Sequence, residues 1–253
     1  MKYVFAGDRQ ISCDILQFLI TKGYYPQALL VTEGSSSTHA EELIKISELN
    51  EEFIFRGKKD LESEHTYDFL KSIRPDYILG IHYPYIISNK IISIPSIGFL
   101  NLHPAFLPYN KGWHTPSWAI IDDTPYGATL HFMSEKLDEG DIIHQKKLDV
   151  LKNDTADSLY KKVLDLEKQV FYEAFDDLVK LNPPRFQQIN QGTSHVKKDL
   201  EKVRKINLED KTTNGELIDR LRALSTDKNS ELAYFFIEEK KIGIKLRFIE
   251  LDS

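Results

Sequence analysis

Three polar residues near the middle of the chain have the types and spacing needed for acyl transfer to an amine. Asn101 and His103 lie two positions apart at the end of an apolar run, so they share one face if the run is a strand. Histidine titrates near neutral pH and can take a proton from an attacking amine, whereas an asparagine amide can stabilise an oxyanion. Asp141 follows a glycine turn and is expected to orient the imidazole. Taken alone, each residue is also typical of a turn, a loop or a helix cap.

Strands that alternate with helices are expected to position these residues. The periodicity predicts an α/β fold with a mostly parallel sheet, helices on both faces and a ligand crevice at the carboxyl ends of the strands. The expected strands are 2–6, 28–32, 52–55, 77–81, 97–102, 127–133 and 142–150, and the expected helices follow residue 10 and cover 61–73, 113–121 and about 155–180. Asn101 and His103 then lie at the carboxyl end of a strand, where catalysis is expected.

A change in sequence character near Gly192 predicts a second, smaller part of the chain. We expect a catalytic domain over residues 1–185 and an appendage over 186–253, with a helix from Thr213 to Leu224 and a β-hairpin built from 232–237 and 242–249. An isolated hairpin is marginal in water. Its apolar residues are therefore expected either to form a dimer interface or to cover the parent domain; they are Phe235, Ile237, Ile244 and Leu246.

Composition narrows the classes of function. The chain has 253 residues, 41% hydrophobic and 28% charged, and a formal net charge of −6, which is typical of a folded globular protein and disfavours nucleic acid as a partner. The single cysteine, Cys13, cannot form an internal disulfide. The N-terminus lacks a long apolar segment, and no run approaches the ~18–20 apolar residues of a membrane span. We therefore expect a cytoplasmic protein without a membrane partner.

Two other chemistries compete with acyl transfer. Four histidines and Asp141 fall within one stretch, but their spacing matches no familiar zinc pattern, so we expect no metal; the histidines are His103, His114, His131 and His144. His131 lies in an alternating strand and is more typical of a structural histidine. The first strand is followed by Gly7 alone, so the dinucleotide fingerprint is absent, as is a phosphate-binding P-loop.

Three ordered motifs resemble those of the 10-formyltetrahydrofolate-dependent formyltransferases. They are Asn101–Gly112, Gly127–Met133 and Leu137–Ile143, and the resemblance covers about residues 1–180. It implies a Rossmann-like fold, a reduced-folate formyl donor, and catalytic roles for Asn101, His103 and Asp141. It also implies a folate pocket in which backbone groups bind much of the pterin, at Ile81, His82, Tyr83, Ile94, Asp138 and Gly140.

The segment 111–118, with Gly7–Arg9 and the tail 213–224, is similar to the branch of this family that formylates nucleotide-linked amino sugars. This similarity implies a dTDP-4-amino-4,6-dideoxy sugar as acceptor, a role in bacterial surface polysaccharide synthesis and a homodimer formed through the hairpin. Candidate contacts to the sugar nucleotide are Arg9, Lys111, Trp113 and His114. Formyl transfer to initiator tRNA, hydrolysis of formyltetrahydrofolate and a non-catalytic binding protein remain alternatives.

Overall fold

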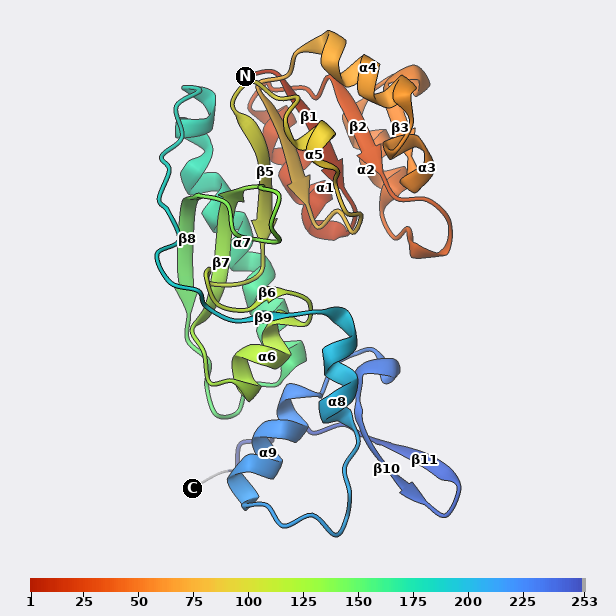
Figure 1. The fold of residues 1–253 in the computed structure, drawn as a ribbon, viewed down its shortest axis with the longest axis vertical. Coiled ribbons are helices and arrows are strands. Elements are labelled where there is room, and N and C mark those ends of the chain that lie inside the picture. The colour runs from red at the N-terminus through yellow and green to blue at the C-terminus, as the bar shows by residue number, and fades with distance from the viewer. Residues whose placement is uncertain (252–253) are drawn as a thin grey trace. The chain divides into compact units, whose positions relative to one another are not determined.

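The computed structural model describes residues 1–251, which form a seven-stranded sheet flanked by helices and a two-stranded hairpin near the C-terminus (Figure 1). The sheet strands are β1 (Tyr3–Gly7), β2 (Ala28–Val31), β3 (Ile54–Arg56), β4 (Tyr77–Ile81), β5 (Gly98–His103), β7 (Tyr126–Phe132) and β8 (Ile142–Leu148). The helices are α1 (Gln10–Thr21), α2 (Ala40–Ser47), α3 (Gly57–Leu61), α4 (Glu64–Ile73), α5 (Asn89–Ile92), α6 (Thr115–Ile121), α7 (Ala156–Val179), α8 (Glu201–Arg204) and α9 (Asn214–Ala223).

The strand order is β3-β2-β1-β4-β5-β7-β8. Pairing is parallel from β3 through β5 and becomes antiparallel between β5 and β7. The α/β fold with a mostly parallel sheet, predicted from the alternation of strands and helices, is confirmed.

Contacts within the chain divide it into two compact units, each described by itself. The first unit comprises 1–103, 129–145 and 167–189, and the second comprises 104–128, 146–166 and the residues from 190 onward. The domain boundary between residues 185 and 186 stays a prediction.

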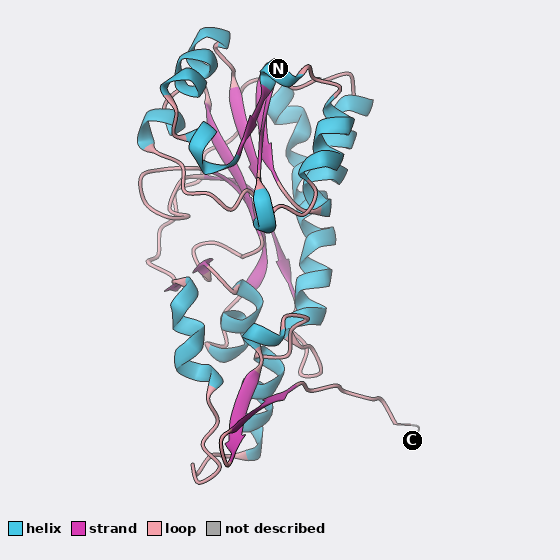
Figure 2. Cartoon of the chain, turned by 90° about the vertical axis from the view of Figure 1, so that its right-hand side faces the viewer, coloured by secondary structure: helices cyan, strands magenta, loops and turns pink. Residues whose placement is uncertain are grey.

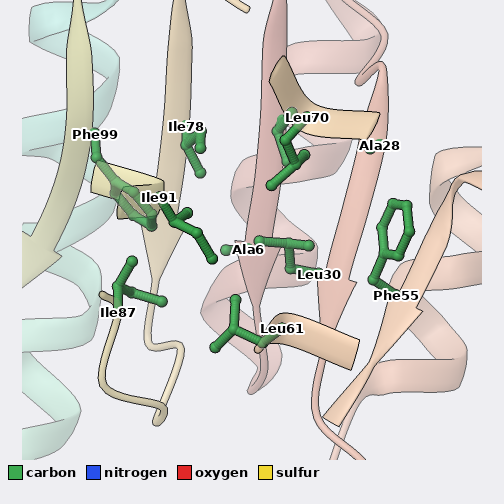
Figure 3. Close-up of a cluster of buried hydrophobic side chains, with 11 residues drawn as sticks. Ala6, Ala28, Leu30, Phe55, Leu61, Leu70, Ile78, Ile87, Ile91 and Phe99 are labelled. Carbon is green, nitrogen blue, oxygen red and sulfur yellow. The ribbon is translucent and has the colours of Figure 1, made fainter. Parts of the chain in front are cut away.

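One face of the sheet in the first unit is covered by α3, α4 and α5. Leu61, Leu70 and Ile91 project from these helices onto apolar side chains of five strands (Figure 3). The strand residues in this cluster are Val4, Ala6, Ala28, Leu30, Phe55, Ile78 and Phe99. Because these side chains alternate along each strand, one face of every strand supplies the cluster.

Helices cover both faces of the sheet, as the sequence predicts (Figure 2). In the first unit, α1 packs against α7 through an edge-to-face contact of Phe18 with Phe171, whose ring centroids are 6.5 Å apart. Cys13 is buried on α1, and burial raises the pKa of its thiol to about 12. The cysteine therefore behaves as a small apolar residue rather than a reactive thiol.

The carboxyl ends of four parallel strands lie at one level of the sheet. Gly7 of β1 is in register with Val31 of β2 and with Ile81 of β4, and Ile81 is in register with Leu102 of β5. The next residue along the chain is polar in each case, and the four residues are Thr32, Asp8, His82 and His103, the last of which ends β5. This edge of the sheet is the one at which open α/β sheets bind their ligands.

The second unit has its own small core. Trp118 of α6, Leu200, Leu224 and Ala233 form a buried cluster. Helix α9 begins with a capping box: the Thr213 hydroxyl accepts a hydrogen bond from the Glu216 N–H, and the Glu216 carboxylate accepts one from the Thr213 N–H. The hairpin consists of β10 (Ala233–Ile237) and β11 (Lys240–Ile244), and a short parallel pair links β6 (Lys111–Gly112) to β9 (Ser194–His195).

Several element boundaries differ from the sequence predictions. The helix expected over residues 61–73 is two helices, because the Ser63 side chain accepts the Thr66 N–H and starts α4 as a new helix. The second hairpin strand begins at Lys240 and ends at Ile244, since the chain turns at Glu238, which has φ of 52°. Among residues 1–251, no helix has the length and apolar character required to cross a lipid bilayer.

Candidate active site

Asp138 is the centre of a polar cluster at the carboxyl end of β5 in the first unit. Its Oδ2 atom lies 3.5 Å from Nε2 of His103, and its Oδ1 atom lies 3.5 Å from Nδ2 of Asn101 and 3.6 Å from Nε2 of His131. Asn101 and His103 thus project from β5 toward the same carboxylate, as their spacing predicts. His103 and Asp138 are both buried.

The amide of Asn101 is oriented by the buried ring of His131. Nδ1 of His131 lies 2.8 Å from the carbonyl oxygen of Phe132, which can only accept, so Nδ1 carries a proton. Burial lowers the pKa of His131 to about 4, so the ring is neutral at pH 7 and its Nε2 atom has a free lone pair. Nδ2 of Asn101 donates to this atom at 3.2 Å. One amide hydrogen is therefore fixed, and the second faces Asp138 across a long contact.

The turn that carries Asp138 is possible because of local backbone geometry. Asp138 has φ of 53°, a left-handed conformation that aspartate tolerates better than most residues. A β-carbon added at Gly140 would lie 1.8 Å from the carbonyl oxygen of Phe132, so only glycine allows the turn to pass this close to the end of β7. Gly140, predicted as a folate contact, thus has a packing role in placing Asp138.

A segment from residues 185 to 188 holds the same turn from outside. Nε2 of Gln188 donates to the carbonyl oxygens of Asp138 and Gly140, at 2.9 and 2.8 Å. Phe186 and Ile142 exchange two backbone hydrogen bonds of 2.8 and 2.9 Å. The position of the Asp138 carboxylate therefore depends on a segment about fifty positions later in the sequence.

Asp141 does not lie where its predicted role requires. Its carboxylate is 3.6 Å from a guanidinium nitrogen of Arg185, and that guanidinium packs over the Phe132 ring at 3.4 Å. Asp138, which the sequence analysis assigned to folate binding, takes the position beside His103 that was expected for Asp141. The reason is the left-handed turn at Asp138, which directs the first aspartate of the motif toward β5 and leaves the second facing Arg185.

Four of the residues predicted to bind folate lie at the end of β4 or in the segment between β4 and β5: Ile81, His82, Tyr83 and Ile94. The carbonyl oxygen of Ile81 accepts a hydrogen bond of 2.6 Å from the Ser12 hydroxyl, and Ile94 packs against the core under α5. The ring of Tyr83 meets that of Tyr85 edge to face, and burial raises the pKa of Tyr83. The imidazole of His82 contacts the carboxylate of Glu167 on α7.

Arg9, a predicted substrate contact, follows β1 with an unusual φ of 77° and precedes α1. Its neighbour Asp8 is buried and accepts hydrogen bonds from the Thr38 hydroxyl and from the N–H groups of Thr38 and His39. Burial alone would raise the pKa of Asp8, but these hydrogen bonds outweigh it and the pKa is lowered. The ionised carboxylate lies 3.8 Å from Nε of Arg9.

The other predicted substrate contacts belong to the second unit. Lys111 is buried in β6, whereas Trp113 is 44% exposed and has the Nζ atom of Lys197 5.2 Å from its ring centroid. His114 has φ of 58°, and its Nδ1 atom is 3.8 Å from the Glu231 carboxylate. Burial lowers the pKa of His114, and the nearby glutamate opposes this effect.

His195 of β9 holds the loop that carries Trp113 and His114. The Trp113 N–H donates to the carbonyl oxygen of His195 at 3.0 Å. The His195 ring stacks on Trp118 with centroids 3.7 Å apart, and its Nε2 atom is 2.7 Å from Asp122. Trp113, with Lys197 beside its ring, has the chemistry to contact a nucleotide base or a phosphorylated sugar.

In the described part of the chain, no three His, Cys, Asp or Glu side chains are grouped so as to hold a metal ion. Sequence reasoning missed four residues that shape the site: His131 as the partner of Asn101, Gln188, Arg185 and Glu167. Gln188 carries no local signal, because it acts on a segment distant in the sequence. The position of Glu167 among the apolar residues of its helix indicates burial, but it does not reveal the partner that Glu167 contacts. His131 faces Asn101 across the antiparallel pair of β5 and β7, a register that only the topology reveals.

Comparison with known protein families gives two matches. Residues 31–175 match the family described as formyl transferase, and residues 199–250 match the N-formyltransferase dimerization C-terminal domain. A curated relative, the dTDP-4-amino-4,6-dideoxyglucose formyltransferase of Mycobacterium tuberculosis, is 32% identical over 173 residues, which are 68% of this chain and 73% of the relative.

Two solved structures resemble the whole chain. One is a 4-N formyltransferase from Francisella tularensis, with 26% identity, a TM-score of 0.82 and 99% of each chain covered. The other is a sugar N-formyltransferase from a Shewanella species, with 23% identity, a TM-score of 0.85 and coverage of 100% of this chain and 99% of that one. The second likeness concerns the fold alone.

Proposed function

The chain belongs to the formyl transferase family, and on this basis we propose that it transfers the formyl group of 10-formyltetrahydrofolate to the amine of a nucleotide-linked amino sugar. The observation that carries the proposal is the convergence of Asn101 and His103 on the Asp138 carboxylate at the carboxyl end of β5. An oxyanion donor, a proton acceptor and a carboxylate that supports it are the groups that direct acyl transfer to an amine needs.

In the proposed reaction, the neutral sugar amine attacks the formyl carbon of the folate. The carbonyl π electrons move to oxygen, and the Asn101 amide hydrogen that makes only a 3.5 Å contact with Asp138 donates to this oxyanion. His103 removes the proton from the attacking nitrogen, and Asp138 stabilises the imidazolium. When the intermediate collapses, the bond to folate N10 breaks and His103 returns the proton to N10, so tetrahydrofolate and a formamide are the products.

We assign the supporting carboxylate to Asp138 and not to Asp141, since only Asp138 lies beside His103. The His103–Asp138 distance of 3.5 Å is longer than an ordinary hydrogen bond. Catalytic contacts commonly tighten when substrate binds, so this length is compatible with the role. Alignment of two bound substrates supplies a further part of the rate, up to roughly 7–11 kcal/mol in well-oriented systems.

The favoured acceptor is dTDP-4-amino-4,6-dideoxyglucose or a close relative, because the mycobacterial relative is named for that sugar. The acceptor contacts proposed from the family resemblance are Arg9, Lys111, Trp113 and His114. For the donor we propose the pterin site at Ile81, His82, Tyr83 and Ile94, beside the turn from Asp138 to Gly140. We propose a cytoplasmic enzyme of bacterial surface polysaccharide synthesis.

A homodimer formed through the C-terminal hairpin completes the proposal. Residues 199–250 match a dimerization domain, and Ile237 and Ile242 are 54% and 36% exposed on the hairpin. Ile244 packs instead against the buried cluster of the second unit. Ile244 thus contributes to the core of the second unit, whereas Ile237 and Ile242 are exposed and would contact the partner subunit in the proposed dimer.

The decisive experiment incubates the pure protein with 10-formyltetrahydrofolate and a panel of dTDP- and UDP-linked amino sugars at neutral pH, with mass spectrometry as the readout. A gain of one formyl group on one sugar would establish the reaction and identify the acceptor. Release of tetrahydrofolate without any formylated sugar would indicate hydrolysis or another amine. Binding of both ligands without turnover would indicate a non-catalytic binding protein.

A further inference from the structure

We propose that Glu167 is a positioning residue for the folate donor: by holding the imidazole of His82, it fixes the backbone turn at the end of β4. The inference rests on the proposed function, in which this turn borders the pterin. It adds a role for the His82 side chain to the backbone contact expected for this residue: the side chain faces the protein interior and holds the backbone in place.

The His82–Glu167 contact is short and buried. Nε2 of His82 lies 3.0 and 2.9 Å from the two carboxylate oxygens of Glu167, and the side-chain exposures are 9% and 0%. Of the glutamates within residues 1–251, only Glu167 is fully buried. An acidic group taken out of water is stable only when it is paired, so the contact is a constraint on both side chains.

The backbone at His82 needs such a constraint. His82 has φ of 51°, in the left-handed region that most residues with a β-carbon avoid, and it directly follows the last residue of β4. Strained backbone of this kind persists when surrounding contacts hold it, and it is common at ligand sites. The carboxylate of Glu167 holds the His82 side chain, because both of its oxygens contact Nε2 of the imidazole ring.

A second contact holds the preceding residue from another helix. The hydroxyl of Ser12 on α1 lies 2.6 Å from the carbonyl oxygen of Ile81, and it also contacts the carbonyl oxygen of Asp8. The end of β4 is therefore fixed by α1 at Ile81 and by α7 at His82. The turn begins a loop that contains Tyr83 and Tyr85, whose rings are 5.2 Å apart, and then leads to α5.

The consequence concerns the orientation of backbone groups. The resemblance to folate-dependent formyltransferases implies that main-chain atoms bind much of the pterin, and their direction after β4 is set by φ at His82. In a donor site built from main-chain atoms, affinity depends on the contacts that hold the backbone in place. Here one of these contacts comes from Glu167, a residue on a different element that does not touch the folate.

The test compares Glu167→Gln with Glu173→Gln in the full-length enzyme. Glutamine at 167 keeps the shape and removes the charge. Glu173 is a matched control, because it lies on the same helix and its carboxylate is 2.8 Å from Nε2 of His144 in an exposed pair. We expect Glu167→Gln to raise the KM for 10-formyltetrahydrofolate roughly tenfold, with the KM for the sugar and kcat changed less than about twofold. Glu173→Gln should change none of them.

A double variant separates the backbone role from a general loss of structure. Glycine adopts a positive φ without strain, so His82→Gly preserves access to the turn but removes the ring that Glu167 holds. If Glu167 acts through His82, adding Glu167→Gln to His82→Gly will produce no further rise in the folate KM. Additive effects would overturn the proposal, as would an unchanged folate KM or an equal change in both KM values in a folded Glu167→Gln enzyme.

If the wild-type protein shows no transfer, the proposed function fails separately. Direct titration of tetrahydrofolate by calorimetry then tests the inference alone. A roughly tenfold weaker Kd for Glu167→Gln, with Glu173→Gln unchanged, would support it. An unchanged Kd, or no binding by the wild-type protein, would overturn it.

Discussion

Oδ2 of Asp138 lies 3.5 Å from Nε2 of His103, and both side chains are buried at the carboxyl end of β5. In the proposed reaction, a carboxylate in this position stabilises the imidazolium that would form when His103 takes a proton from the attacking amine. Asp138 and Asp141 belong to one turn, so they offer a matched pair for assigning the role.

Asp138→Asn should lower kcat by roughly 10²–10⁴-fold, because the supporting negative charge beside His103 is lost while the shape is kept. Asp141→Asn should lower it by less than about tenfold, since Asp141 faces Arg185. Single-turnover formation of the formamide measures both. A larger loss from Asp141→Asn than from Asp138→Asn would return the role to Asp141.

The lowered pKa of His131 predicts that the free energy of unfolding depends on pH. The folded ring stays neutral down to about pH 4, whereas an unfolded histidine takes up a proton near pH 6.5, so the unfolded chain binds more protons between these values. The contribution of His131 to the free energy of unfolding is therefore full above about pH 6.5. It should fall by about 1.4 kcal/mol per pH unit as the pH drops toward 4.

Urea unfolding of the wild type and of His131→Gln across this pH range tests the point. The variant should lack the His131 part of the slope, and His144→Gln, at an exposed position, should retain it. Identical slopes in wild type and His131→Gln would contradict a buried neutral ring.

Gln188→Ala should lower kcat about tenfold with a modest loss of stability. It removes two hydrogen bonds to the turn that carries Asp138, each worth about 0.5–1.5 kcal/mol, and leaves the carboxylate less well aimed. Gln187→Ala, at the exposed neighbouring position, is the control and should be silent. Equal activity in both variants would show that the turn that carries Asp138 keeps its conformation without the hydrogen bonds from Gln188.

Gly140→Ala should destabilise the fold by at least about 2 kcal/mol, because the added methyl group meets the Phe132 carbonyl oxygen at 1.8 Å. Gly215→Ala places the same group in open space on α9 and should be neutral or slightly stabilising. Thermal unfolding of the two variants beside the wild type measures the difference. A Gly140→Ala protein as stable as the wild type would refute the close approach.

Ile237→Glu should convert the proposed dimer to monomers. Ile237 is 54% exposed on β10, so a charge there is tolerated by the single chain but would be buried at the hairpin interface. Ile189→Glu changes a more exposed isoleucine outside the hairpin and should leave the assembly intact. Sedimentation velocity distinguishes the outcomes; a dimer that survives Ile237→Glu would place the interface elsewhere.

The sequence was sufficient where the information was local. Alternation in the run before His103 predicted that Asn101 and His103 share a face, and Thr213 with Glu216 predicted the start of α9. The choice between Asp138 and Asp141 was not local. Both carboxylates flank the same glycine, and which one faces β5 depends on the left-handed turn and on Gln188.

The contact of Glu167 with His82 could not be predicted from the sequence for a related reason. Glu167 lies in a helix rich in charged residues, and although it falls at helical spacing among Val163, Val170 and Phe171, its residue type is one that is normally solvated. Its burial follows from the packing of α7 and from the position of His82, eighty-five residues earlier. A buried charge of this kind is recognised only when both partners are seen together.

The register that places Val31, Gly7, Ile81 and Leu102 at one level of the sheet fixes the number of residues in each of these strands, and a polar residue comes next in the chain after each of them. Deleting or inserting a single residue within any one of these strands would shift the polar residue that comes next and turn the neighbouring side chains to the opposite face. Changes in chain length should therefore be tolerated in the connections between strands far better than within them. An engineer who wishes to change the proposed acceptor has freedom in the loops after the strands, and almost none in the strands themselves.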